Sequence, residues 1–278
     1  MPTTSSVRAR LACAAATLGA ALASLPATTT PAHAAPPTAY TVTGVDTSHH
    51  NHGREETTPI DWRRVATNHS FAFLKATQGT RYTDPWLQRD YTAAAGTTLL
   101  RAPYHFFDPR TTGDGAAQAR HFVAAARAAG YQGGGKGELP PVLDIEKVHR
   151  NHKEVCPPEL RVQQVRIFLD EVERSFAVKP IVYTRASFVQ ECMGGRGEVF
   201  AGHPLWLARY RSGANEPQPV PGAGRSWTFW QHTDEAQTPG IPGRSDLNVF
   251  RGSTADLRAL AGRGQQAQPS APSDTTRS

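Results

Sequence analysis

The 278-residue chain is poor in cysteine and in aromatic residues, and it has no long apolar run beyond its first 34 residues. It contains three cysteines, and Phe, Trp and Tyr make up 8% of it. No later segment approaches the roughly 20 apolar residues that a membrane-spanning helix requires. The formal net charge of +6 is not gathered into a basic stripe, so we expect no nucleic-acid partner.

The N-terminal region has the three parts of a secretory signal peptide. Arg8 and Arg10 precede an apolar stretch from residue 11 to 25, and Ala32-His33-Ala34 offers small residues around a cleavage point. The stretch is too short and too rich in alanine to span a membrane. We therefore predict a signal peptide over residues 1–34, a secreted, extracellular protein, and no stable membrane association.

Two cysteines remain after the predicted signal peptide, which contains Cys13. An even pair in an exported protein, here Cys156 and Cys192, favours a disulfide over a metal site or a catalytic thiol. Closing a loop of this length would stabilise the fold by about 3–4 kcal/mol in the chain-entropy treatment.

Strand-like and helix-like segments alternate in the first two thirds of the chain, which is typical of a mostly parallel sheet with crossover helices. Five such units are expected, with strands at Tyr40–Asp46, Phe71–Thr77, Leu99–Phe106, Pro141–Glu146 and Pro180–Tyr183.

Helix start signals follow most of these strands. Asp84 with Pro85, Asp114, the Pro157-Pro158 pair and a capping-box pattern at Ser187 each predict the beginning of a helix.

After Gly194 the pattern changes to strands joined by loops rich in Gly and Pro, without room for full helices. These strands are predicted at His203–Tyr210, Trp227–His232 and Asp246–Phe250. The fold class is therefore α/β, a modified TIM-like barrel of five β/α units followed by three helix-poor strands. We place this domain at residues 40–261 and expect a disordered tail over residues 262–278.

The stretch "ELPPVLDIEKVH" carries two carboxylates at the end of an apolar strand. Alternation along a strand places Asp144 and Glu146 on one face and Leu143 and Ile145 on the other. Two nearby carboxylates in a partly dry cleft cannot both ionise freely, so one can act as a general acid. Glycosidic cleavage uses such a pair, although D-x-E is a short pattern that also fits ordinary surface acids.

Other strand ends supply further candidates. Asp46 ends the first strand and Asp246 begins the last, and these strands are neighbours in a closed barrel, so four acids can converge. Aromatic rings suit the faces of sugars, although most are core residues. We expect Tyr104 and Trp206 to line the cleft and at least two others to be packing, among Tyr183, Tyr210, Trp227 and Trp230.

Six ordered motifs together resemble glycoside hydrolase family 25, the Chalaropsis-type lysozymes. They are "GVDTSHH", "FAFLKATQGTRYTDP", "APYHFFDP", "LPPVLDIE", "PIVYTRASF" and "WTFWQHT…GIPGRSDLNVF", collinear from Gly44 to Phe250. The resemblance implies an N-acetylmuramidase that cuts the β-1,4 bond of peptidoglycan after N-acetylmuramic acid. It also implies a cysteine pair at positions like those of Cys156 and Cys192.

The resemblance assigns roles to individual residues. Glu146 would protonate the leaving oxygen with Asp144 as its partner, and Asp46 and Asp246 would be the other two cleft acids. Tyr104 matches the tyrosine of the family pattern, and Lys75 in "FAFLKATQGT" is a further substrate-binding candidate. The D-x-E spacing favours catalysis assisted by the substrate's own acetamido group over a carboxylate nucleophile.

The chain departs from the family pattern at two positions. Asn51 stands where the family has glutamine, and Gln78 stands where it has the glutamate of "KATEG". Both departures bear on substrate positioning near the first two strands more than on the chemistry.

Three alternatives remain at this point. His49, His50 and His52 would suit a metal-dependent hydrolase, but no H-E-x-x-H pattern supports one and a surface loop explains them better. A wall-binding protein could keep the barrel without catalysis. A chitinase-like enzyme of family 18 would carry a longer acidic run before D-x-E. We expect no metal or cofactor, peptidoglycan strands as the partner, and a monomer.

Overall fold

The computed structural model describes Met1 and residues 35–210 and 216–262. The predicted signal peptide and the tail beyond Gly262 lie outside the described residues. Within the described part of the chain, no helix is long and apolar enough to cross a membrane.

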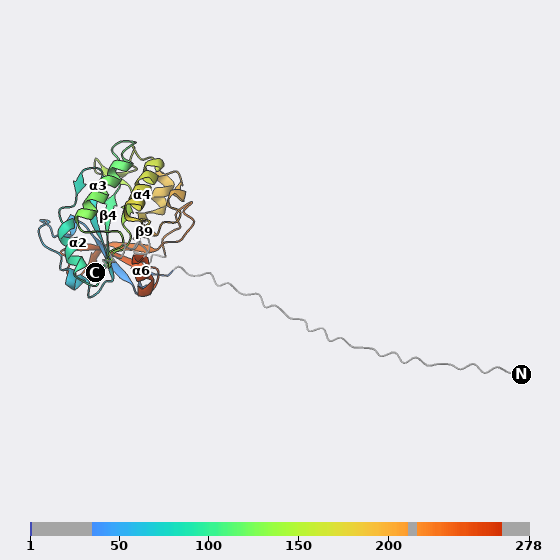
Figure 1. The fold of residues 1–278 in the computed structure, drawn as a ribbon, viewed down its shortest axis with the longest axis horizontal. Helices are drawn as coiled ribbons and strands as arrows, with labels where there is room; N and C mark the ends of the chain where they lie inside the picture. The colour runs from blue at the N-terminus through green and yellow to red at the C-terminus, as the bar shows by residue number, and fades with distance from the viewer. Residues whose placement is uncertain (2–34, 211–215, 263–278) are drawn as a thin grey trace, which may run out of the picture. The chain divides into compact units, whose positions relative to one another are not determined.

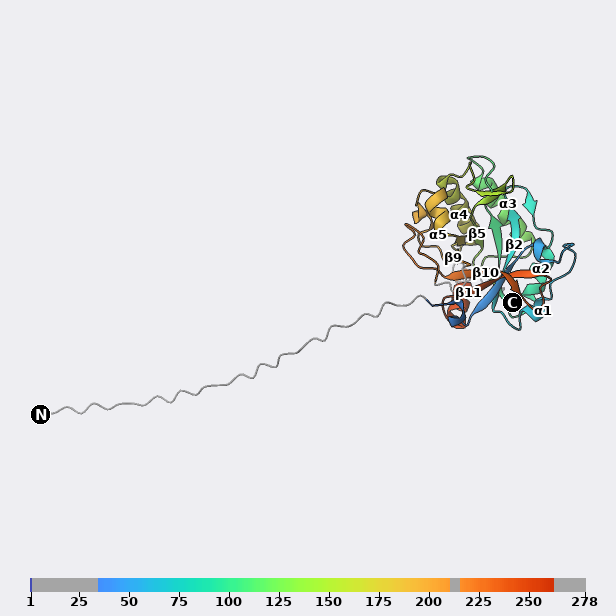
Figure 2. The ribbon, with the colours of Figure 1, turned by 180° about the vertical axis from the view of Figure 1, so that it is seen from behind.

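Eight strands close into a barrel (Figures 1 and 2), because β1 pairs with β2 on one side and with β11 on the other. The pairings are parallel except those of β11, which runs antiparallel to both of its neighbours. The barrel strands are β1 (Thr43–Thr47), β2 (Phe71–Gln78), β4 (Leu100–Phe106), β5 (Val142–Asp144), β8 (Ile181–Thr184), β9 (Leu205–Ala208), β10 (Phe229–Gln237) and β11 (Arg244–Phe250). All eight predicted strands are present, with ends that shift by a few residues.

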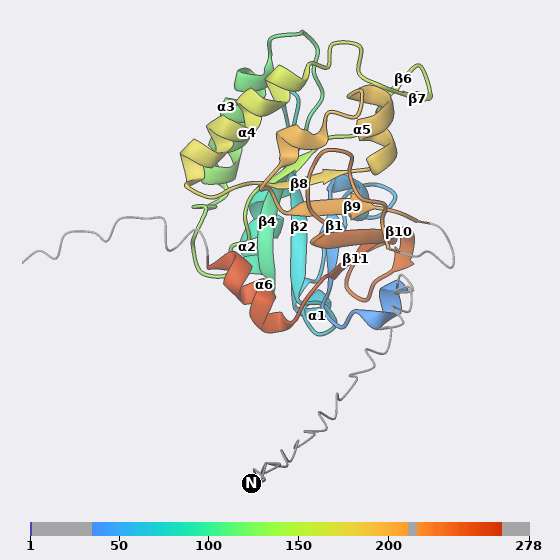
Figure 3. The same ribbon diagram turned by 90° about the vertical axis from the view of Figure 1, so that its right-hand side faces the viewer.

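A helix follows each of the first five barrel strands, which confirms the five predicted β/α units. They are α1 (Trp62–Val65), α2 (Leu87–Ala95), α3 (Gly115–Ala128), α4 (Val162–Phe176) and α5 (Ala186–Cys192). Helices α3 and α4 lie side by side (Figures 1 and 3). A Cβ at Gly115 would lie 2.3 Å from the carbonyl oxygen of Gln164, so this glycine permits the close approach of the two helices.

Shorter elements complete the described chain. Strand β3 (Tyr82–Thr83) extends the sheet beside β2, and β6 (Val148–Arg150) and β7 (Lys153–Val155) form a separate hairpin. Three short 3₁₀ helices are η1 (Pro37–Ala39), η2 (His49–Asn51) and η3 (Gly197–Phe200).

Three helix predictions are corrected by the structure. The helix expected to open at Pro157 and Pro158 begins at Val162, and Ser187 lies inside α5, whose N-cap is Arg185. A further helix, α6 (Thr254–Ala261), occupies a region where no full helix was expected. Its start is marked by a capping box in which Ser253 and Asp256 bond each other's backbone amides, a signal already present in the sequence.

Alternation along the strands divides the buried side chains between two cores. One side of each strand packs against the surrounding helices, as Leu74, Leu143 and Val182 do. The other side fills the barrel interior, whose lower part is apolar and aromatic and is closed by Leu257 and Leu260 of α6. Figure 3 shows α6 at the end of the barrel opposite to α5 and the β6–β7 hairpin. The four predicted acids lie toward the other end of the barrel, which carries α5 and the β6–β7 hairpin.

The predicted disulfide is present. It joins Cys156, which follows β7, to Cys192, the last residue of α5, with a Cα–Cα distance of 5.3 Å. The bond ties the β6–β7 hairpin to a helix on the same end of the barrel that carries the carboxylates.

Candidate active site

The four acids converge at one end of the barrel, as the strand order predicts. Asp46 lies near the end of β1 and Asp144 is the last residue of β5, while Glu146 lies two residues beyond that strand. Asp246 lies near the start of β11, and because β11 runs antiparallel to β1, it pairs directly with Asp46. The carboxyl ends of barrel strands are where active sites of this architecture lie.

Protein donors surround the carboxylate of Asp46. Gln231 Nε2 donates to Asp46 Oδ1 at 3.0 Å and to Oδ2 at 2.8 Å, and Asn248 Nδ2 donates to Oδ2 at 2.7 Å. Trp206 Nε1 in turn donates to Asn248 Oδ1 at 2.7 Å and fixes the orientation of that amide. Asp46 is therefore a buried carboxylate held by a complete set of hydrogen bonds.

Asp46 and Asp246 share one proton. Burial raises the pKa of Asp46, and hydrogen bonds from Asp246, Asn248 and Gln231 oppose that rise. Burial and the adjacent charge of Asp46 raise the pKa of Asp246 to about 10. The proton therefore resides on Asp246, while Asp46 carries the negative charge.

Asp144 and Glu146 form a second pair with a different environment. Asp144 is buried, and its Oδ1 has no hydrogen-bond partner among the residues that the structure describes. Burial and then the charge of Glu146 raise the pKa of Asp144 well above its usual range. Burial raises the pKa of the partly exposed Glu146 to about 7, against the opposing charge of Arg185. This pair therefore holds a proton near neutral pH, and one of its buried oxygens has no hydrogen-bond partner within the described part of the chain.

Two cations, Lys75 on β2 and Arg185 directly after β8, balance the charge of the acids. Lys75 on β2 is partly buried, and its charge lowers the pKa of Asp144, as that of Arg185 does. Lys75 Nζ donates to Gln78 Oε1 at 3.0 Å, so the glutamine at this position holds the lysine ammonium. The Arg185 guanidinium lies over the ring of Tyr210 at 5.0 Å from the centroid.

The other departure from the family pattern, Asn51, has a structural role. Its Oδ1 accepts from the backbone N–H of Ser48 at 2.8 Å, and its Nδ2 donates to the carbonyl of Arg244 at 2.9 Å. Asn51 thus holds the segment after β1 against the start of β11.

A pocket of about 580 Å³ lies next to the acid cluster at Gln78, which bonds Lys75. None of the four predicted acids (Asp46, Asp144, Glu146 and Asp246) lines this pocket. Its lining residues are Gln78, Gly79, Thr80, Arg81, Tyr82, Asp108 and Arg110.

The tyrosines predicted for the site lie among the acids. The hydroxyls of Tyr183 and Tyr210 both donate to Gln231 Oε1, that of Tyr183 at 2.7 Å. Burial and the charges of Asp46 and Asp144 raise the pKa of Tyr104 well above its usual range, so its hydroxyl keeps its proton.

The tryptophan predictions are corrected in part. Trp206 is 2% exposed and packs against Phe73 and Tyr183 inside the barrel, so it supports Asn248 and does not line a cleft. Trp230 is fully buried and donates to the carbonyl of Arg209. Trp227 is also buried, so Trp227 and Trp230 are packing residues, as was expected of at least two of the candidates other than Tyr104 and Trp206.

Three polar residues of the site were not singled out from the sequence. Gln231 and Asn248 hold Asp46, and the charge of Arg185 acts on Glu146. A signal for two of them was available, since Asn248 follows Asp246 by two residues and Arg185 follows Tyr183 by two. Strand alternation therefore places each on the same face as a predicted residue.

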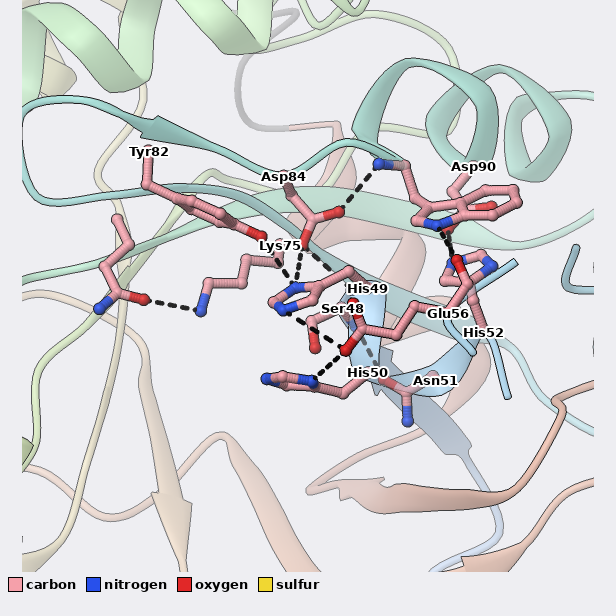
Figure 4. A network of polar contacts seen from close by, with 12 residues as sticks. Ser48, His49, His50, Asn51, His52, Glu56, Lys75, Tyr82, Asp84 and Asp90 are labelled. Carbon is pink, nitrogen blue, oxygen red and sulfur yellow. Dashed lines mark hydrogen bonds and ion pairs between the residues drawn. The ribbon is translucent and has the colours of Figure 1, made fainter. Parts of the chain in front are cut away.

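The histidine-rich segment after β1 is not simply a surface loop. His52 is completely buried, and its Nε2 lies 2.9 Å from Asp90 Oδ2 (Figure 4). The ring of His52 also stacks on that of Trp86. His49 is partly buried beside Asp84, and only His50 is exposed.

Sequence comparison identifies relatives with known names. The chain is 34% identical over 230 residues to the uncharacterized protein YegX of Escherichia coli strain K12, covering 81% of this chain and 75% of YegX. It is 34% identical to Lysozyme M1 of Streptomyces globisporus, covering 79% of this chain and 71% of that protein. It is 33% identical to the N,O-diacetylmuramidase of Chalaropsis sp., covering 69% of this chain and 87% of that enzyme.

Solved structures agree with these matches. The bacterial lysozyme of Streptomyces coelicolor superposes with a TM-score of 0.68 at 32% identity, covering 80% of this chain and 98% of that one. A muramidase of Acremonium alcalophilum gives a TM-score of 0.65 at 30% identity, with coverages of 80% and 99%. The sequence profile of glycosyl hydrolases family 25 matches residues 45–241 of this chain. The chain therefore belongs to glycosyl hydrolases family 25.

Proposed function

We propose that this protein is a secreted lysozyme that hydrolyses the β-1,4 bond between N-acetylmuramic acid and N-acetylglucosamine in peptidoglycan. The family membership supports the reaction class, and relatives named lysozyme and N,O-diacetylmuramidase support the substrate. The observation that carries the proposal is the Asp144–Glu146 pair, which holds a proton near neutral pH at the carboxyl ends of the barrel strands.

Glu146 acts as the general acid. Its pKa of about 7 keeps a large part of it protonated at neutral pH, which a glycosidic oxygen needs because it is a poor leaving group until it receives a proton. Arg185 and Lys75 lower the pKa of Glu146 and keep it close to the working pH. After the sugar has left, the resulting carboxylate can take a proton from the water that attacks.

Asp144 orients the acetamido group of the muramic acid residue. Asp144 is 7% exposed, and its buried Oδ1 has no hydrogen-bond partner among the described residues, so the carboxylate keeps acceptor capacity that we assign to the substrate's N–H. That bond favours the ionised form of Asp144 and leaves the shared proton on Glu146. The acetamido oxygen then attacks the anomeric carbon, as in glycosidases that use their substrate in place of a carboxylate nucleophile.

The Asp46–Asp246 pair supplies a fixed negative charge at the opposite side of the barrel mouth. Asp46 is the member of the pair that ionises more readily, because hydrogen bonds from Gln231 and Asn248 oppose the effect of its burial, and its charge stabilises the positive charge that develops on the sugar. The tyrosine hydroxyls on Gln231 Oε1 hold this arrangement before substrate arrives.

The proposal is tested by digesting purified peptidoglycan, reducing the new ends with borohydride and identifying them by mass spectrometry. The wild-type protein should produce reduced muramic acid ends, and Glu146→Gln should not. New glucosamine ends or free amines would place the cut in another bond. A protein that binds the wall without releasing products would be the non-catalytic wall-binding protein.

A further inference from the structure

Three metal-ligand side chains gather beside the acid cluster, in and after η2. One ligand atom from each of His49, His50 and Glu56 lies within 4.8 Å of the other two (Figure 4). The Glu56 oxygen is 4.0 Å from His49 Nε2 and 3.0 Å from His50 Nδ1. The reaction proposed for Glu146 and Asp144 uses none of these groups.

His49 is oriented by a buried carboxylate. Asp84 Oδ2 lies 2.9 Å from His49 Nδ1 and also accepts the backbone N–H of His49 at 3.0 Å, and the Asp84 side chain is only 2% exposed. The Tyr82 hydroxyl also lies 2.9 Å from Nδ1, so the contacts of this nitrogen are taken by Asp84 and Tyr82, and Nε2, 4.0 Å from Glu56 Oε1, is the ring nitrogen left for a metal. Metal-binding histidines are held in this way by an acid on the far ring nitrogen.

Glu56 and His50 complete the cluster from the solvent side. The backbone of Glu56 is fixed, because its carbonyl accepts from Trp86 Nε1 at 3.1 Å and its N–H donates to the carbonyl of Gly53 at 2.9 Å. The side chains of His50 and Glu56 are 72% and 45% exposed, so both can adjust. A metal ion would take the place of the direct contact between His50 Nδ1 and Glu56 Oε1.

We propose that His49, His50 and Glu56 form a binding site for a divalent transition metal, with Zn²⁺ as the ion that fits the donors best. Two imidazoles and one carboxylate, with water in the fourth position, are a common zinc ligand set. Zinc bonds of about 2.0–2.1 Å in a tetrahedron place ligand atoms roughly 3.3 Å apart. The two distances to the Glu56 oxygen, 3.0 and 4.0 Å, lie on either side of that value.

The ion would tie the segment from η2 to Glu56 at the edge of the active site. The charge of Asp84, which holds His49, also acts on Lys75 and Tyr104. This proposal revises the expectation of no metal, but it assigns the ion a structural position and no step of the cleavage. It does not depend on the proposed lysozyme activity.

The site is tested by titrating Zn²⁺ into the untagged protein in competition with a chromophoric chelator. We expect one ion per chain, and an affinity at least about tenfold lower in His50→Ala and in Glu56→Gln. Matched controls are His149→Ala and Glu55→Gln, which alter exposed residues outside the cluster and should bind as the wild type does.

A second measurement keeps the test independent of folding. Zn²⁺ should raise the melting temperature of the wild type and of both controls, and it should leave His50→Ala unchanged. Circular dichroism establishes that each variant is folded. Absence of stoichiometric binding, or equal affinity in wild type and His50→Ala, would overturn the proposal.

Discussion

The two carboxylate pairs at the mouth of the barrel have the same chemistry but different surroundings. Asp46 and Asp246 are held by Gln231 and Asn248, which leave Asp46 without a free acceptor site for substrate. Asp144 keeps a buried oxygen without a partner in the described chain, and Glu146 is partly exposed. In the mechanism that we propose, protein groups alone hold the first pair, whereas the second pair gains a hydrogen-bond partner from the substrate.

The largest expected effect is the loss of catalysis in Glu146→Gln. Removal of the proton donor should lower kcat by about 10²–10⁴-fold or more, with little change in KM, because the amide cannot protonate the leaving oxygen. Release of reduced muramic ends from peptidoglycan measures the rate. Asp246→Asn is the matched comparison, since Asp246 is already protonated and should lose much less activity.

The same variant should be more stable than the wild type above neutral pH. The folded-state pKa of Glu146 is raised to about 7 from 4.5, so the native state binds the proton more tightly than the unfolded state does. Wild-type stability therefore falls as pH rises from about 4.5 to 7, whereas the amide of the variant does not titrate. Urea unfolding at pH 5 and pH 8 checks this, and an equal difference between the two proteins at both pH values would contradict it.

Asp144→Asn should lower kcat by about 10²–10³-fold. The amide can still contact the substrate, but it lacks the charge that orients the acetamido N–H and supports the developing positive charge. Steady-state kinetics on a soluble muroglycan would measure the change. A variant with unchanged kcat and raised KM would reduce Asp144 to a simple binding residue.

Removal of the disulfide should affect the Asp144–Glu146 pair more than the Asp46–Asp246 pair, because the bond holds a hairpin that lies near Glu146. Cys156→Ser with Cys192→Ser is expected to cost about 2–4 kcal/mol in the free energy of unfolding. The bond holds the β6–β7 hairpin, which carries Glu154, near Glu146. Urea unfolding measures the cost, and a loss well below 1 kcal/mol would mean that other contacts hold the hairpin.

Asn248→Ala should lower the stability of the protein at the Asp46–Asp246 pair. It removes one hydrogen bond to Asp46 and leaves the buried Nε1–H of Trp206 unpaired, at a cost of about 1–3 kcal/mol. Chemical denaturation is the measurement, and Asn68→Ala on the surface is the control. Stability equal to that of the wild type would mean that water or a new partner satisfies both groups.

The smallest expected effect is a shift in the pH dependence of activity in Glu154→Gln. Activity should fall as pH rises above about 7, because Glu146 must carry a proton to act as the acid. The charge of Glu154 raises the pKa of Glu146, so Glu154→Gln should move this descending limb to lower pH. The measurement is kcat/KM as a function of pH. If the fall above about pH 7 occurs at the same pH in Glu154→Gln as in the wild type, it does not report the titration of Glu146.

Much of the fold was predictable because the strand pattern and the chain order of the β/α units are local properties of the sequence. All four acids could be placed, since alternation and strand direction determine which residues face the barrel mouth. The role of Trp206 was not predictable, because an inward ring can line a cleft or fill the interior, and only the packing of Phe73 and Tyr183 decides between these positions. The partnership of Gln231 with Asp46 likewise joins residues that are 185 positions apart.

The measurement that tests the account most directly compares cleavage of N-acetylated and N-deacetylated muroglycan by the wild type and by Asp144→Asn. If Asp144 acts through the acetamido group, deacetylation should slow the wild type strongly and Asp144→Asn hardly further, because both changes remove one interaction. Fully multiplicative effects of the two changes, or a glycosyl ester trapped on Asp144 or Asp46, would contradict the account.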